Sequence, residues 1–141
     1  MACPYFVPLA PDPECSPSHA TLPLGDAWTG MCHATPESPW QPGSETLYPI
    51  CNLGYARARC PRFPDGDGPD AVRFTISASE GSVVRLYYVV ERGHLPFAHG
   101  SLDYSLPESQ FQPAPPDPVV GRLAAAYVAS YLRRLNEASA R

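Results

Sequence analysis

The stretch AVRFTISASEGSVVRLYYVV at residues 71–90 decides the fold class of this chain. In its first part, Val72, Phe74 and Ile76 alternate with polar residues, the period of a strand with one buried face. The second part, Val83–Val90, is rich in β-branched and aromatic residues, which favour strands. A glycine in the short connection permits a tight turn. The stretch therefore predicts an antiparallel hairpin.

Two further elements are predicted on the C-terminal side of this hairpin. A short third strand at Ser101–Ser105 would give the hairpin the cover that an isolated pair of strands lacks. Asp117 followed by Pro118 is a helix-start pattern, so a helix is predicted over 117–137. We expect this amphipathic helix to pack across the hairpin face. Its apolar positions are Val120, Leu123, Ala124, Tyr127, Val128, Tyr131, Leu132 and Leu135.

Residues 1–70 differ from the rest of the chain. They contain all five cysteines and most of the 19 prolines, without a sustained helical or strand period. So long a loop in a compact chain is unusual unless it is functional or held by something other than backbone ladders. We predict one α+β domain over 1–141, in which a cysteine- and proline-rich wrap at 1–70 covers antiparallel strands at 71–105 and the C-terminal helix.

Composition excludes several classes of function. The net charge is −4, and the ten basic residues are all arginines without a basic run, so nucleic acid is not an expected partner. The chain lacks an apolar stretch of the length that a membrane helix needs, and its start lacks the pattern of a signal peptide. We expect a cytoplasmic protein without membrane association. In that reducing compartment, several cysteines favour metal or redox chemistry over disulfides.

The cysteine spacing is wide, with neither a zinc-knuckle pair nor a bacterial ferredoxin run. Cys3 and Cys60 are each followed by proline, as is the last cysteine of a ferredoxin run. The expected ligands are Cys3, Cys32, Cys51 and Cys60. Bulky apolar neighbours flank these four cysteines and predict a dry shell around a shared centre. These neighbours are Tyr5, Phe6, Trp28, Met31, Tyr48, Ile50, Tyr55 and Phe63.

Charged neighbours divide the cysteines further. Cys15 follows a glutamate, whose carboxylate would repel an anionic thiolate-ligated centre, so we exclude it as a ligand. Three arginines surround Cys60 in the sequence, at Arg57, Arg59 and Arg62. They would offset the negative charge of a cluster or lower a thiol pKa, or they are ordinary surface residues.

Other interpretations of the thiols and histidines stay open. The cysteines are alternatively buried free thiols, since unpaired cysteine behaves as a small hydrophobe. A histidine, among His33, His94 and His99, would replace one cysteine ligand, or all three are loop histidines. A thiol-dependent enzyme is a further alternative, and Cys15 is then the thiol to test.

Four sequence strings resemble those of small bacterial proteins that share a four-cysteine signature and have no assigned activity. They are CPYFVP at 3–8, LGDAW at 24–28 leading to Cys32, CNLGYAR at 51–57 and DAVRF at 70–74. The resemblance implies that the four chosen cysteines form one set with Cys15 outside it. Widely spaced cysteines that close a loop region also resemble the iron-sulfur staples of certain DNA-processing nucleases, whose catalytic residues have no counterpart here.

Four thiolates suit an iron-sulfur cluster or zinc, and we favour a [4Fe-4S] cluster because it bridges separated loops more easily than one ion. The first predicted function is electron transfer or redox sensing, with a redox partner protein. A zinc- or cluster-stapled module that docks on a larger assembly is the alternative, since metal binding can stabilise a small fold. A catalysed reaction is not predicted.

Overall fold

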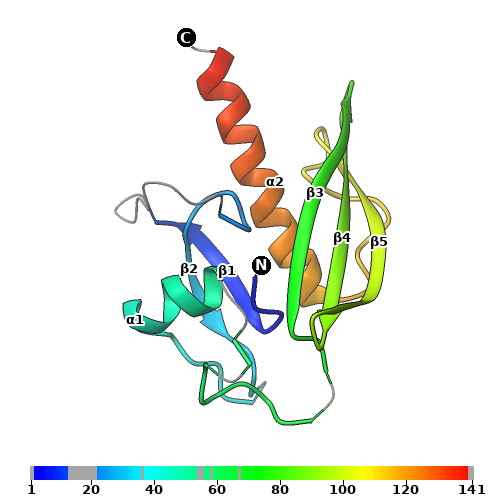
Figure 1. Ribbon diagram of the computed structural model, residues 1–141. Coiled ribbons are helices and arrows are strands. Elements are labelled where there is room, and N and C mark those ends of the chain that lie inside the picture. Colours follow the sequence, from blue (N-terminus) through cyan, green and yellow to red (C-terminus); the bar gives the residue numbers. More distant parts are fainter. Residues whose placement is uncertain are drawn as a thin grey trace.

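The computed structural model describes residues 2–12, 22–35, 37–53, 56–57, 59–66 and 68–139. The chain forms two antiparallel sheets and one long helix, an α+β fold as predicted (Figure 1). The elements in chain order are β1 (Phe6–Pro11), β2 (Trp28–Cys32), α1 (Ser44–Thr46), the π-helical segment η1 (Leu47–Asn52), β3 (Ala71–Glu80), β4 (Val83–Arg92), β5 (Leu95–Ser105), β6 (Gln110–Phe111) and α2 (Pro118–Ser139).

The larger sheet has the strand order β3-β4-β5-β6, with every neighbouring pair antiparallel. The predicted hairpin is confirmed, and Gly81 in its turn has a φ of 61°, which glycine adopts without strain. The predicted third strand is also present, but it begins at Leu95 rather than Ser101. One face is buried through alternating side chains such as Phe74 and Leu86, and this face forms the main core.

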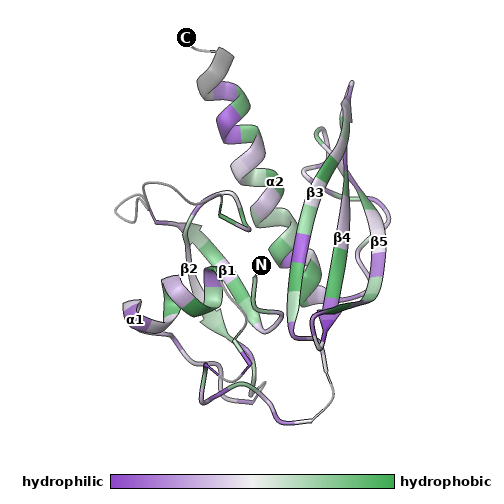
Figure 2. Cartoon of the chain, viewed as in Figure 1, coloured by the Kyte–Doolittle hydropathy of each residue, from purple (hydrophilic) through white to green (hydrophobic). Residues whose placement is uncertain are grey.

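Helix α2 lies between the two sheets and contacts both of them (Figure 1). Asp117 caps it by accepting a hydrogen bond from the Val119 N–H at 2.9 Å. Leu123 is fully buried, and Tyr127 stacks on Phe74 of β3 with ring centroids 5.6 Å apart. Figure 2 shows that hydrophilic residues increase toward the C-terminal end of the helix. The predicted apolar face is therefore wrong at its end, where Leu135 is 43% exposed.

The prediction that regular structure begins at residue 71 is wrong. Strands β1 and β2 form a two-stranded sheet inside the proline-rich segment, and α1 with η1 adds a helical turn. Pro8 and Pro11 interrupt the strand pattern of β1 in the sequence. They are tolerated because β1 has only one neighbour, so its other edge needs no ladder donors.

Gly30 shows why this small sheet was hidden from pattern analysis. Glycine inside a strand usually weakens it, but here β1 and β2 approach closely at this point. A Cβ atom at residue 30 would lie 2.1 Å from the Val7 carbonyl oxygen and 2.8 Å from the Phe6 ring. The glycine is therefore what allows the Phe6 side chain to lie inside the core.

The Asn52 side chain joins the small sheet to the helical turn. Its Nδ2 donates to the Trp28 and Leu47 carbonyls at 3.0 and 2.8 Å, and its Oδ1 accepts the Trp28 N–H at 2.9 Å. The residue is 1% exposed, so water cannot replace these bonds. The start of β2 and the start of η1 are thus held together by one carboxamide.

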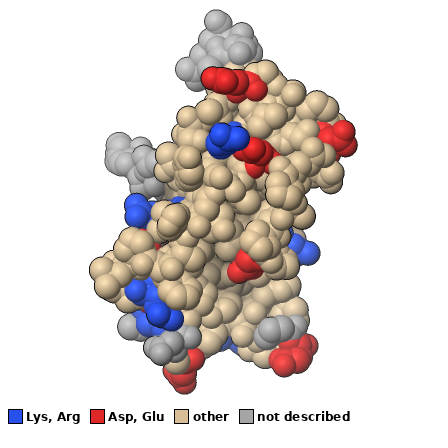
Figure 3. All heavy atoms as spheres, turned by 90° about the vertical axis from the view of Figure 1, so that its right-hand side faces the viewer, with Lys and Arg blue, Asp and Glu red and all other residues tan. Residues whose placement is uncertain are grey.

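The outer surface carries few charges on the side of β5. Figure 3 shows this side as mainly uncharged, with acidic and basic residues scattered over it. On the larger sheet, Arg85 and Asp103 form an exposed ion pair at 2.7 Å. No helix in the described part of the chain has the length and hydrophobicity required to cross a bilayer.

Replacing Asn52 with alanine is expected to lower the free energy of unfolding by about 2–3 kcal/mol, because buried backbone groups lose their partners. Urea unfolding of the metal-free protein measures this loss. Asn136→Ala is the control, since Asn136 is exposed on α2. Equal stability of the two variants would contradict the role given to the Asn52 carboxamide.

Candidate metal centre

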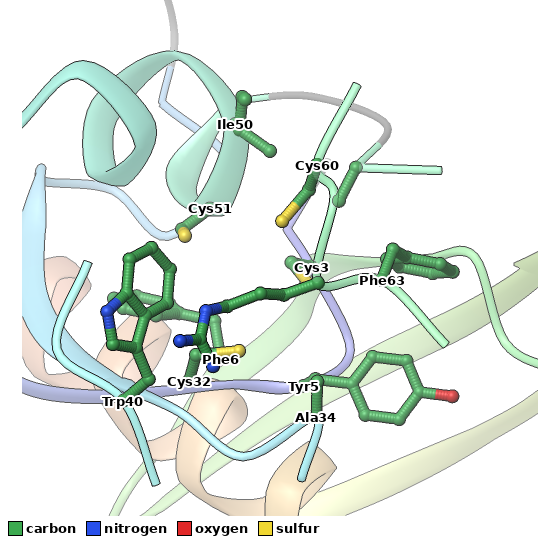
Figure 4. Close-up of a pocket in the computed structure, with 12 residues that line it drawn as sticks. Cys3, Tyr5, Phe6, Cys32, Ala34, Trp40, Ile50, Cys51, Cys60 and Phe63 are labelled. Carbon is green, nitrogen blue, oxygen red and sulfur yellow. The ribbon is translucent and has the colours of Figure 1, made fainter. Parts of the chain in front are cut away.

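Cys3, Cys32, Cys51 and Cys60, the four cysteines predicted as ligands, line one cavity (Figure 4). They come from four separate parts of the chain: the segment before β1, the end of β2, the end of η1 and the loop before β3. Cys3 and Cys51 are buried, whereas Cys32 and Cys60 are partly exposed, and none of the four is in a disulfide. Their grouping, predicted from count and flanking residues, is present in the fold.

Backbone hydrogen bonds fix the relative positions of the cysteines. The Cys3 N–H donates to the Cys51 carbonyl at 3.2 Å, and the preceding residue, Ala2, exchanges two 2.9 Å hydrogen bonds with Val72 of β3. Cys32 pairs with Phe6 in the small sheet and also exchanges backbone hydrogen bonds with Trp40 at 2.6 and 3.0 Å. The cavity is therefore built where the N-terminus meets both sheets.

The Cys60 loop is held by its own turn. The Cys60 N–H donates to the Ala56 carbonyl at 2.7 Å, and the Phe63 N–H donates to the Cys60 carbonyl at 3.1 Å. The Phe63 ring packs edge-on against Tyr5, with centroids 5.4 Å apart. This contact brings the loop back toward the segment that carries Cys3.

The walls of the cavity are apolar and aromatic, as predicted, but their membership differs in part. Tyr5, Phe6, Ile50 and Phe63 line it. Trp28 was expected there and is instead directed toward α2, where its Nε1 donates to Ser130 at 3.3 Å. The tryptophan in the wall is Trp40.

The remaining expected shell residues have other positions. Tyr48 donates a hydrogen bond to Asp12, and neither it nor Met31 is among the described residues that line the cavity. Tyr55 lies outside the described residues. Sequence analysis missed Trp40 because only the long-range pairing of its backbone with Cys32 brings it to the site.

Burial keeps the two inner thiols protonated. Burial raises the pKa of the Cys3 thiol to about 12; the Tyr5 backbone N–H opposes the rise, and the nearby Cys32 and Cys60 thiols add to it. Burial likewise raises the pKa of Cys51 to about 12, and the other three cysteines contribute to this rise. A nucleophilic thiol needs a depressed pKa, so Cys3 and Cys51 are unsuited to that role.

The thiols surround a space rather than converge on a point. No three Cys, His, Asp or Glu side chains in the described ranges are placed to hold one metal ion. The enclosed space is about 10 Å³, close to what one water molecule needs. Four thiols and largely apolar walls are the donor type and lining that a thiolate-bound cluster would need, but the enclosed space is too small for one as it stands.

The three arginines near Cys60 have different roles. Arg57 pairs with Asp70 and lies over the Phe63 ring at 4.7 Å. Arg62 is exposed, yet it lines the cavity, with its guanidinium 4.3 Å from the centre of the Trp40 ring. Arg59 is exposed on the outside, where it lines a surface hollow with Cys60. Of the three arginines, Arg62 is thus the one that lines the cysteine cavity.

The hypothesis that a histidine completes the centre has no geometric support. His33, His94 and His99 are all described, and none of them lines the cysteine cavity. His33 follows Cys32 but lines a different cavity, on the other side of Tyr5. Cys15 lies outside the described residues.

Comparison with known proteins adds no relative: no family model matches the chain, and no curated protein or solved structure is significantly similar to it.

The stability of the metal-free protein is expected to fall as the pH rises above about 9. The pKa values of Cys3 and Cys51 are about 12 in the folded chain against 9.0 normally. Above about pH 9 the unfolded state therefore releases thiol protons that the folded state keeps. The free energy of unfolding then falls by on the order of 1 kcal/mol per thiol for each pH unit. Urea unfolding at about pH 8 and about pH 10.5 measures the loss.

The control for this experiment is the double variant Cys3→Ala/Cys51→Ala, compared by its change with pH and not by its absolute stability. Most of the pH dependence should disappear in it. A decline of the same size in both proteins would show that other groups, not these thiols, cause the alkaline loss.

Proposed function

We propose that Cys3, Cys32, Cys51 and Cys60 bind one [4Fe-4S] cluster and that the protein transfers electrons or senses redox state. The observation that carries this proposal is the meeting of four thiols, from four separate segments, around one apolar cavity. If these positions served only to fill the core, small apolar side chains without sulfur would pack there equally well. Four cysteines at one place in a chain with only five are better explained by a shared ligand.

The spread of the thiols favours a cluster over a single zinc ion. A zinc site needs all four sulfurs about 2.3 Å from one point, and the four cysteines here come from four separate segments of the chain. In a cluster each thiolate binds a different iron, so the cysteines only need to surround it. Such a cluster, when bound, supplies one-electron chemistry.

The residues of the chain have separate tasks in this proposal. The backbone N–H groups of Tyr5 and Phe6, which favour the ionised form of Cys3, would stabilise a thiolate ligand and tune the reduction potential. Phe6, which is buried, and Ile50, which is partly buried, would limit the access of water to the cavity. Arg62 would move off Trp40 to admit the cluster and then offset its negative charge.

Cys60 marks the side from which electrons would enter or leave. It lines both the cysteine cavity and an outer hollow of about 410 Å³ with Arg57 and Arg59. Cys3 and Cys51 are buried, and Cys32, although partly exposed like Cys60, does not line this outer hollow. A redox partner protein in the reducing cytoplasm would therefore approach the cluster at Cys60, where Arg59 and Asp65 also line the hollow and Arg57 is paired with Asp70.

The test is the visible spectrum of protein purified without oxygen, with iron, sulfide and zinc measured on the same sample. We expect a brown protein with equal iron and sulfide that is reduced reversibly. Each single alanine replacement of Cys3, Cys32, Cys51 or Cys60 should lower bound iron several-fold, because a cluster with a missing ligand is labile. Cys15→Ala is the matched control and should keep its iron.

The other outcomes separate the alternatives. Unchanged iron in all four variants would contradict the ligand assignment. A colourless protein that contains zinc and unfolds when the zinc is removed would replace the redox function with a structural one.

A further inference from the structure

A second cavity, of about 510 Å³, lies beside the cysteine centre and is much larger than it. It is bounded by the N-terminal segment, by β4 and β5, and by the first turn of α2. A volume of this size suits a small organic molecule, for which typical sites measure roughly 300–1,000 Å³. Core residues Val72, Val90 and Val120 form part of its wall.

The walls favour a flat and apolar ligand. Tyr5, Tyr88 and Phe97 supply aromatic rings, and four prolines supply rigid apolar surface. The ring of Tyr88 lies across Gly100 of β5, since a Cβ atom at residue 100 would be 2.8 Å from the Tyr88 hydroxyl oxygen. Aromatic walls of this kind are suited to stacking against another ring.

The charges in the cavity favour an uncharged ligand. No arginine is among the described residues that line it, and the arginine at its rim, Arg92, already stacks on Phe97, so an anion such as a phosphate would have no lining arginine to pair with. The carboxylate that lines it, Asp117, already accepts the Val119 N–H at the start of α2. The remaining polar groups are His33 and two tyrosine hydroxyls, which can donate hydrogen bonds to a carbonyl oxygen.

The rim of the cavity carries an exposed aromatic ring that packs against an arginine. Phe97 of β5 is 53% exposed, and the guanidinium of Arg92, at the end of β4, lies 4.1 Å from the centre of its ring. A ligand bound at the cavity mouth would cover this ring, and burial of its apolar surface would contribute favourably to the free energy of binding. The neighbouring Leu95 is 68% exposed.

We propose that this cavity binds a flat, uncharged aromatic molecule of one or two rings that carries carbonyl or hydroxyl groups. The ligand would lie next to the cysteine centre, because Tyr5 lines both cavities. The His33 N–H also donates to the Tyr5 carbonyl at 2.8 Å, which fixes this shared wall. Binding itself does not depend on a metal in the cysteine cavity.

The test uses 2,3-dimethyl-1,4-naphthoquinone as the probe, because its methyl groups block the ring positions that thiols attack. Calorimetric titration of the full chain, with and without metal, measures the affinity. NMR shift changes in the same titration should be confined to residues around the cavity, such as His33, Val90 and Val120. An anionic analogue, naphthalene-2-carboxylate, should bind at least several-fold more weakly.

Adjacent tyrosines on opposite faces of β4 give a matched pair of variants. Tyr88→Phe removes a hydroxyl from the cavity wall and should weaken binding about three- to tenfold, whereas Tyr87→Phe changes the exposed face and should leave it unaltered. Ala98→Phe fills the cavity and should abolish binding.

Two results would overturn the proposal: no binding of the quinone by the intact protein, or shift changes spread over the surface that Tyr88→Phe does not reduce. Binding to metal-free protein would support this cavity even if the cysteines prove to hold no cluster. If the protein holds a cluster but does not bind the quinone, the proposal for this cavity is wrong and the proposal for the cysteines stands.

Discussion

The Asn52 side chain makes three hydrogen bonds inside the core, and the positions of three cysteines follow from them. It joins the start of β2 to the start of η1. Cys32 ends that strand, and Cys51 precedes the asparagine in that helical segment. The Cys51 carbonyl then accepts the Cys3 N–H, which brings in the N-terminus. Buried polar networks of this kind are specific because each unsatisfied member is costly.

The fourth cysteine depends on a second buried polar residue, Asp70. It accepts the Gly93 N–H at 2.6 Å and pairs with Arg57. Burial opposes its ionisation, but these two partners outweigh burial and hold the pKa of Asp70 below its usual value. Arg57 in turn covers Phe63, three residues after Cys60. The larger sheet thus fixes the loop that completes the centre.

The parts of this fold that the sequence predicts are those whose pattern is local. Alternation at Val72, Phe74 and Ile76 marks a strand wherever the chain folds, and Asp117 caps α2 as its position suggests. Strand β1 has no such pattern, because its prolines are tolerated only at a sheet edge. Its partner strand contains Gly30, whose purpose is visible only where Val7 lies against it.

The site divides in the same way. The four cysteines could be grouped from their number and their flanking residues, and they do meet. The choice of Trp28 over Trp40 for the wall could not be made correctly, since both tryptophans lie within eight residues of Cys32 in the sequence. Only tertiary contacts distinguish the two tryptophans. The backbone of Trp40 pairs with Cys32, whereas the Trp28 side chain donates a hydrogen bond to Ser130 of α2.

The central claim, that one cluster is bound by this single chain, is tested most directly by native mass spectrometry of protein purified without oxygen. The account predicts an intact monomer mass increased by one four-iron, four-sulfide unit, and loss of that increase in the Cys51→Ala variant. A mass equal to that of the bare chain, or increased by one zinc ion, would contradict it.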